Sequence, residues 1–132
     1  MNKKNLLHNE IEFVKERQVI NMGGPWIGNL IFKGKLLSKE CIVDNYVFDD
    51  IDHKIFFVKY HSITGNMNGV FFSINFHMVK DERLFEYEKR FETLFIKNVV
   101  NDKLEIFEAF HDKIEKYKTY FDLNEKFTEV SS

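Results

Sequence analysis

The amino-acid sequence predicts a mostly β protein, an antiparallel meander that forms two packed sheets or propeller-like blades. The chain is rich in residues that fit a pleated sheet, with Phe at 15 positions and a single alanine, Ala109. Apolar and polar residues alternate over residues 70–79, the two-residue period of a strand. Short clusters of Gly, Asn, Asp and Lys separate the apolar runs. Strands joined by short polar turns are typical of antiparallel sheets, which must pack together to bury Phe on both faces.

The first half of the chain predicts a succession of strands joined by turns. Residues 26–32 form an apolar run that the Lys33-Gly34-Lys35 break separates from Leu36-Leu37, the pattern of a hairpin. Residues 41–48 continue into a polar turn at 49–53, where Asp side chains can bond the backbone. The nearly all-apolar run 55–60 then indicates a strand in the middle of a sheet.

The second half begins with a loop over residues 61–69, which holds two glycines and two asparagines. The alternating strand 70–79 follows. Residues 93–97 and 104–110 are expected to pair as a hairpin around the turn residues 98–103.

Three segments fit both strand and helix. Residues 81–95 have apolar side chains at helical spacing but also on one face of a strand, and we favour a strand because a short polar turn precedes them. The termini, residues 6–19 and 113–130, are equally ambiguous. A short helix near 82–96 or 111–123 therefore stays open.

Length and composition indicate a single domain over residues 1–132. The formal net charge is -2, so the chain lacks the basic field that drives binding to nucleic acid. The lone cysteine, Cys41, cannot form an intrachain disulfide, and the start of the chain lacks the apolar stretch of a signal peptide. No apolar run approaches the length of a membrane span. We expect a cytoplasmic protein.

The glycine-rich segment Gly23 to Gly28 superficially resembles a phosphate-binding loop. Such a loop leads into a helix N-terminus and is usually followed by Lys and Ser or Thr, whereas a strand follows here. We therefore interpret the segment as a tight turn before the first predicted strand. Trp26 is expected to be a core or edge aromatic residue.

Neither a metal site nor a catalytic site is predicted. The histidines show no zinc-ligand spacing and no partner cysteines; they are His8, His53, His61, His77 and His111. His111 and Asp112 resemble a base with its orienting carboxylate, and Cys41 or Ser73 could serve as a nucleophile. Because nothing in the sequence brings these side chains together, we predict no catalytic residue, no cofactor and no metal.

The strongest local charge asymmetry lies between Lys39 and Lys54. This segment has five acids and no base: Glu40, Asp44, Asp49, Asp50 and Asp52. The acids lack the spacing and the glycine of a calcium-binding hand. They are interpreted either as a solvated turn or as an acidic patch that attracts a basic protein surface.

One family resemblance suggests a function. The run Gly23 to Leu30, the turn Asp49 to Asp52, the strand Ile55 to Tyr60 and the run Ala109 to Asp112 resemble small bacterial immunity proteins. These are encoded beside polymorphic or contact-dependent growth-inhibition toxins. The resemblance covers about residues 20–112, and no functional residue of the family can be carried over, because its toxin-contacting positions vary.

The resemblance implies a cytosolic, non-enzymatic binder that neutralises a cognate toxin domain, such as a nuclease, by occluding its active site. It implies no direct contact with nucleic acid or membrane, and it leaves the toxin and the oligomeric state open. Our candidate contacts are the acids of the patch, with two weaker additions: Asp44, Asp49, Asp50, Asp52, Glu108 and Asp112. The alternatives are a small β-rich enzyme or a subunit of a larger complex.

Overall fold

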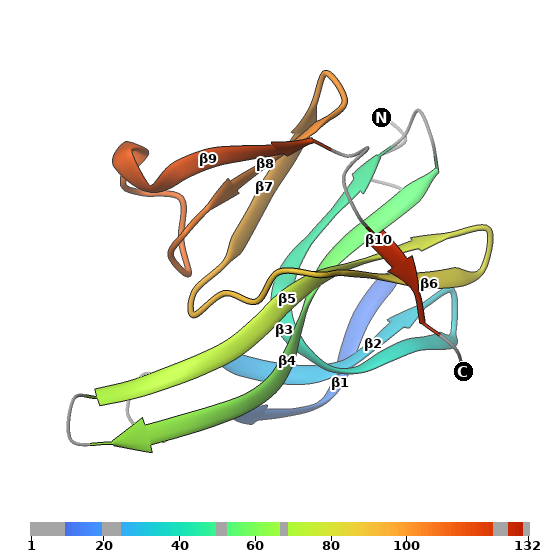
Figure 1. The fold of residues 1–132 in the computed structure, drawn as a ribbon. Helices are drawn as coiled ribbons and strands as arrows, with labels where there is room; N and C mark the ends of the chain where they lie inside the picture. Colours follow the sequence, from blue (N-terminus) through green and yellow to red (C-terminus); the bar gives the residue numbers. More distant parts are fainter. Residues whose placement is uncertain (1–9, 20–24, 50–52, 67–68, 123–126, 131–132) are drawn as a thin grey trace.

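The computed structural model describes residues 10–19, 25–49, 53–66, 69–122 and 127–130, with the backbone alone at 64–66 and 69–71. Ten strands and one short 3-10 turn form its regular structure (Figure 1). In chain order these are β1 (Ile11–Gln18), β2 (Trp26–Phe32), β3 (Lys35–Asp49), β4 (Lys54–Asn66), β5 (Gly69–Lys80), β6 (Arg83–Tyr87), β7 (Phe95–Val100), β8 (Lys103–Phe107), η1 (Glu115–Tyr117), β9 (Lys118–Asp122) and β10 (Phe127–Glu129). The prediction of a mostly β fold is confirmed.

The strands form two antiparallel sheets. The larger has seven strands in the order β1-β2-β3-β4-β5-β6-β10, and the smaller has three in the order β7-β8-β9. The chain leaves the large sheet after β6, builds the small sheet and returns to add β10 beside β6 (Figure 1). The two sheets pack together through contacts of β7 with β3 and β4. Of the two predicted arrangements, packed sheets are the one observed.

Most of the predicted strands are confirmed. The hairpin over residues 26–37 is β2 with the start of β3, and the run 70–79 lies within β5. The run 55–60 lies in β4, the fourth of seven strands, as its apolar character predicts. The hairpin of β7 and β8 also forms, but its turn is confined to Asn101 and Asp102.

The predicted loop over residues 61–69 is wrong. Here β4 and β5 continue to pair as far as Asn66 and Gly69, which makes this hairpin a long arm (Figure 1). Glycine and asparagine weaken a strand but do not prevent it when a partner strand supplies the ladder of backbone hydrogen bonds. The turn residues predicted at 67–68 lie outside the described residues.

Among the described residues, neither of the two possible helices forms as an α-helix. Within 82–96 the chain forms β6 and then an irregular segment, in which Phe91 exchanges backbone hydrogen bonds of 3.0 and 2.7 Å with Ile74 of β5. The favoured strand in 81–95 is therefore confirmed over 83–87. Within 111–123 the described residues hold only the single 3-10 turn η1 before β9. Tertiary pairing decides both segments, because their local patterns permit either state.

Both faces of the large sheet are buried. Along β4, Phe56 and Val58 pack in one core cluster while Ile55 and Phe57 pack in another, as the alternation of a strand requires. The first cluster lies between the two sheets. Its centre is Phe76, whose ring stacks on Tyr87 at 4.3 Å between ring centroids.

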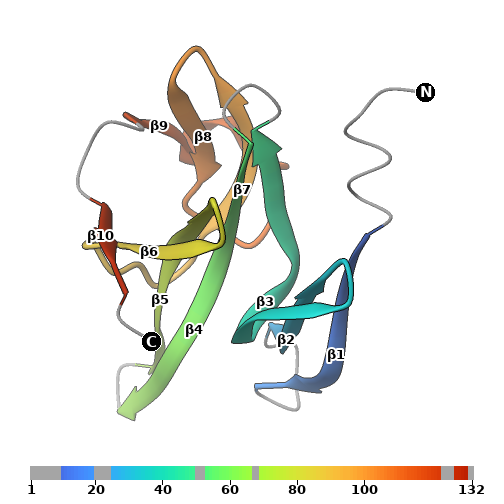
Figure 2. The ribbon, with the colours of Figure 1, turned by 90° about the vertical axis from the view of Figure 1, so that its right-hand side faces the viewer.

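The second cluster is covered by the large sheet itself, which is strongly curved. Figure 2 shows β3 running beside β4 in its upper part and turning toward β2 and β1 in its lower part. The curvature brings the start of β3 close to the turn after β5. Lys35 Nζ lies 3.8 Å from Glu82 Oε1 there. In the same cluster, the ring centroids of Phe32 and Phe48 lie 5.9 Å apart. Among the described residues, the curvature of the large sheet thus buries a face that the small sheet does not cover.

Candidate functional site: an acidic cleft and a histidine cluster

An irregularity in β3 shapes the first candidate site. Cys41 of β3 pairs with Lys59 of β4, yet the next paired residue, Tyr46, pairs with Phe57. Four residues of β3 therefore stand opposite the single residue Val58 and bulge out of the sheet. Asp44 lies in this bulge with a φ of 61°, a left-handed conformation that Asp tolerates better than most residues.

Asn45 of the bulge joins the two sheets. Its side-chain Nδ2 donates to the carbonyl of Leu94 (2.6 Å), and its Oδ1 accepts from the backbone N–H of Ile96 (2.8 Å). The amide thereby occupies the place of a neighbouring strand along the first residues of β7. Because Asn45 is buried, these two bonds fix the small sheet at one position against β3.

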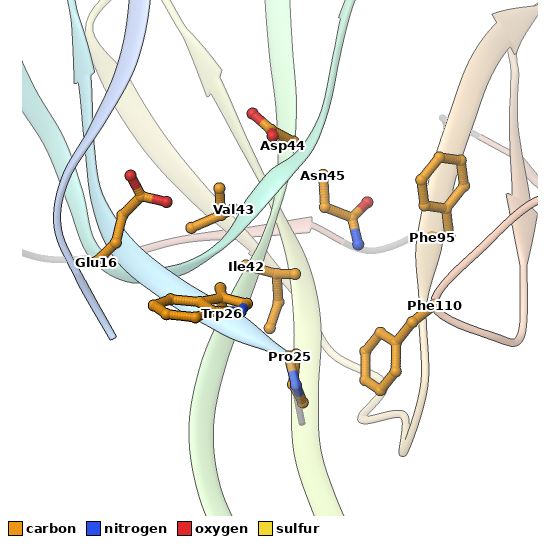
Figure 3. Close-up of a pocket in the computed structure, with 9 residues that line it drawn as sticks. All are labelled: Glu16, Pro25, Trp26, Ile42, Val43, Asp44, Asn45, Phe95 and Phe110. Atoms are coloured by element: carbon orange, nitrogen blue, oxygen red, sulfur yellow. The ribbon is translucent and has the colours of Figure 1, made fainter. Parts of the chain in front are cut away.

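A cleft of about 670 Å³ opens beside this contact between the two sheets (Figure 3). The large sheet provides one wall and the small sheet the other, and Asn45 lies between them. The lining residues are Glu16, Pro25, Trp26, Ile42, Val43, Asp44, Asn45, Phe95 and Phe110.

The cleft walls are largely apolar. Trp26 lies flat beside Ile42 on one wall, and Phe95 and Phe110 stand on the other (Figure 3). The Trp26 side chain is 51% exposed. Of the two positions expected for Trp26, core or edge, this exposure excludes the core. The ring is a solvent-facing aromatic surface, the kind of residue that often dominates binding at protein interfaces.

Two carboxylates complete the cleft. Glu16 comes from β1 and Asp44 from the bulge of β3, and both are exposed. Gly28 of β2 leaves room for the Glu16 side chain. A Cβ at this position would lie 3.1 Å from the carbonyl oxygen of Val14 and 3.2 Å from Glu16 Cγ, so a larger residue would crowd Glu16. Within the described residues neither acid forms a salt bridge, and no Lys or Arg lines the cleft. Burial, with a smaller effect from Asp44, raises the pKa of the adjacent Tyr46 to about 12.

This arrangement suits a side chain with a cationic head and an apolar stem. An indole face attracts a Lys or Arg head by about 0.5–2 kcal/mol, depending on how far the pair is desolvated. Carboxylates bind the same heads through charge-assisted hydrogen bonds. The apolar walls would meanwhile cover the stem.

The structure separates the other predicted acids from Asp44. Asp49 is buried, so its carboxylate is not presented at the surface. Asp50 and Asp52 lie outside the described residues. Glu108 is exposed beside Lys89 and Arg90 in a separate depression, and Asp112 forms a salt bridge with Lys97. Among the predicted contacts that the structure describes, Asp44 is the one that lines the cleft.

The residues considered for hydrolysis are also separated by their local contacts. Burial raises the pKa of the Cys41 thiol to about 11, which disfavours the reactive thiolate near neutral pH. Ser73 Oγ accepts a hydrogen bond from Arg90 (3.3 Å). His111 Nδ1 accepts from the backbone N–H of Lys113 (3.3 Å), while Asp112 is paired with Lys97.

A second polar cluster escaped the sequence analysis. Asn75, fully buried on β5, holds two histidines: its Oδ1 accepts from Nε2 of His61 (2.6 Å) and from Nε2 of His77 (3.1 Å). Its Nδ2 donates to Glu86 Oε1 (3.0 Å) and to the carbonyl of Tyr87 (2.9 Å). These two donations identify the amide orientation, so both imidazoles donate through Nε2.

The surroundings of the cluster keep its histidines neutral. Burial, followed by the charges of His61, Lys59 and Arg90, lowers the pKa of His77 to about 3. Burial also lowers the pKa of His61, although its bond to Asn75 opposes the shift. Within the described residues, His77 Nδ1 has no hydrogen-bond partner.

One signal could have located the cluster. His77 and Asn75 share a face of β5 by strand alternation, and the predicted strand 70–79 already implied this. The positions of His61 and Glu86 depend on cross-strand register, which the predicted 61–69 loop obscured.

The chain matches no protein-family model, and comparison with curated proteins and with solved structures gives no match. Within the described residues, no helix has the length and apolar character needed to cross a membrane.

Proposed function

We propose that this chain is a protein-binding module that neutralises a cognate toxin domain, in the manner of the bacterial immunity proteins that its sequence resembles. The acidic cleft would dock on a basic surface of the toxin and occlude its active site. One observation carries the proposal: Glu16 and Asp44, exposed and without a salt bridge in the described structure, flank the exposed ring of Trp26.

The charge of the cleft fits a toxin that acts on nucleic acid. A nuclease binds its substrate through Lys and Arg side chains that contact phosphates. An inhibitor with carboxylates at the matching positions competes for those side chains, and the attraction also accelerates association. Trp26 would supply the buried aromatic anchor at the centre of the interface.

Neutralisation of such a toxin requires the inhibitor to meet it in the cytoplasm, where its substrates are. Binding alone suffices for this role, so the proposal needs no catalytic residue, cofactor or direct contact with nucleic acid. The competing functions are a β-rich enzyme and a subunit of a larger complex.

Co-expression tests the proposal. The C-terminal domain encoded by the neighbouring gene is induced with and without this chain, and growth and co-purification are scored. The wild-type chain should restore growth and co-purify with the toxin domain. No rescue and no complex would contradict the proposal.

A pair of charge-matched variants localises the interface. Glu16→Gln with Asp44→Asn removes both cleft acids, whereas Glu12→Gln with Glu88→Gln removes two exposed acids outside the cleft and changes the net charge equally. The cleft variant should lower the association rate at least about tenfold at low salt, and the control less than about twofold. Equal effects of the two variants would place the interface elsewhere.

A further inference from the structure

We propose that His61, His77 and Glu86 form a binding site for a divalent transition-metal ion of the zinc type. Neither the resemblance nor the proposed toxin binding involves these residues. The site lies on one face of three neighbouring strands, with His61 on β4, His77 on β5 and Glu86 on β6.

Strand register brings the three side chains together. His77 and Glu86 are direct cross-strand partners. His61 lies at an irregularity of β4, where the pairing steps from Tyr60–Ile74 to Ser62–Ser73 and leaves His61 without a paired residue. Such a bulge re-aims a side chain, here toward Asn75 and the other strands.

The separations are close to those of a metal site. One ligand atom from each of the three residues lies within 4.8 Å of the other two. Tetrahedral ligands at the usual zinc distances lie roughly 3.4 Å apart, so the groups must close by about 1 Å or a little more. A metal binds the ring nitrogen that carries no proton. Because both Nε2 atoms donate their proton to Asn75 Oδ1, coordination uses either Nδ1, or Nε2 after the proton has moved to Nδ1 and the bond to Asn75 has broken.

The donor set is that of a transition metal rather than of calcium or magnesium. Two imidazoles and one carboxylate are typical of zinc and non-haem iron sites, whereas calcium and magnesium prefer oxygen ligands alone.

One nitrogen of the network has no partner in the protein. His77 is only 2% exposed, and its Nδ1 forms no hydrogen bond with the described residues. Most buried polar groups in native proteins are hydrogen-bonded, and a bound ion or water is one recognised explanation for an exception. His61 and Glu86 are only half-buried, which gives an ion a route of entry.

Two cations oppose binding and limit its strength. Arg90 lies 3.4 Å from Glu86 and would have to release that carboxylate. Lys59 donates hydrogen bonds to Ser38 Oγ and the Lys39 carbonyl, yet its charge still acts on both histidines and so opposes a bound cation. We therefore expect a one-to-one complex with a Kd on the order of micromolar rather than the far tighter binding of a structural zinc site.

Titration of the full chain with zinc and cobalt salts after chelator dialysis tests the site. Zinc binding is followed by calorimetry, and cobalt binding by its visible d–d absorption. Zinc should also raise the Tm by about 10 °C at a hundredfold excess over Kd. A Kd weaker than about 1 mM for both ions would overturn the proposal.

Three ligand variants and one control localise the site. His61→Gln, His77→Gln and Glu86→Gln should each weaken zinc binding at least about 100-fold, exceeding the loss typical of an outer-shell partner. His53→Gln, an exposed histidine outside the cluster, should bind as the wild type does. Because His77 is buried and its variant could unfold, the half-buried His61 and Glu86 decide the outcome: wild-type affinity in both of these folded variants would exclude the site.

Discussion

The acidic cleft and the histidine cluster are both polar, but they differ in how their polar groups are satisfied. In the cleft, Glu16 and Asp44 face solvent without an ion pair in the described structure. In the cluster, Asn75 is buried and all four of its hydrogen bonds are made inside the protein. Polar groups already paired in the fold contribute to its stability, whereas unpaired groups, the cleft acids and the Nδ1 of His77 among the described residues, remain available to a partner or an ion.

The largest effect should follow removal of the amide that holds the cluster. Asn75→Ala leaves the ring of His77 and the carbonyl of Tyr87 without that partner, and we expect a loss of about 4 kcal/mol in the free energy of unfolding. Urea denaturation measures it. Asn98→Ala is the matched control. The exposed side chain of Asn98 bonds only the backbone N–H of its neighbour Val99 in the described structure, so this substitution should cost less than about 1 kcal/mol.

A slightly smaller effect is expected at the contact that positions the cleft walls. Asn45→Ala removes the bond to the carbonyl of Leu94, just before β7, and the bond from the amide of Ile96 in β7, and it should cost about 3 kcal/mol. Hydrogen exchange should show the loss of protection at the amide of Ile96. Unchanged exchange there would mean that packing alone holds the two sheets together.

Acid should destabilise the metal-free protein through the cluster. The pKa of His77 is about 3 in the folded chain and about 6.5 when unfolded, so below pH 6.5 the unfolded chain binds more protons. The contribution is complete above pH 6.5 and falls with pH down to about 3, with a loss of about 2 kcal/mol from His77 between pH 7 and pH 5. Urea denaturation in chelator at both pH values measures this loss, and His77→Gln should reduce it. An unchanged pH dependence in that variant would contradict the assignment to His77.

The smallest effect on stability is expected in the cleft. Glu16→Gln with Asp44→Asn should change the free energy of unfolding by less than about 0.5 kcal/mol, because neither acid has a salt bridge to lose and Asn tolerates the left-handed backbone at position 44. Thermal and urea denaturation measure it. A loss above about 1 kcal/mol would mean that the cleft acids support the fold.

Much of the fold follows from local patterns in the sequence. The two-residue alternation gives β5, and the unbroken apolar run of β4 places it at the centre of the sheet because both of its faces are buried. The glycines and asparagines of 61–69 predict a loop because they favour turns. The pairing of β4 with β5 continues through this segment, and no local pattern in the sequence indicates it.

The candidate sites depend on longer-range geometry. Asp44 was predicted from charge alone, but Glu16 and Trp26 join it only through the bulge of β3 and the packing of the sheets. Likewise, the approach of His61 to His77 depends on an irregular register in one hairpin. No local sequence pattern encodes either arrangement.

The late addition of β10 has a consequence for synthesis on the ribosome. β6 is translated roughly 40 residues before β10, an interval of roughly 2 to 8 seconds at ordinary elongation rates. During that interval the nascent chain leaves the outer edge of β6 open to pairing with other chains. Before β10 is made, the charge of Arg83 on that edge disfavours pairing with other strands. Once β10 pairs with β6, Arg83 Nε and Nη2 bind the Glu129 carboxylate at 2.9 and 3.2 Å, so the same arginine then stabilises the added strand.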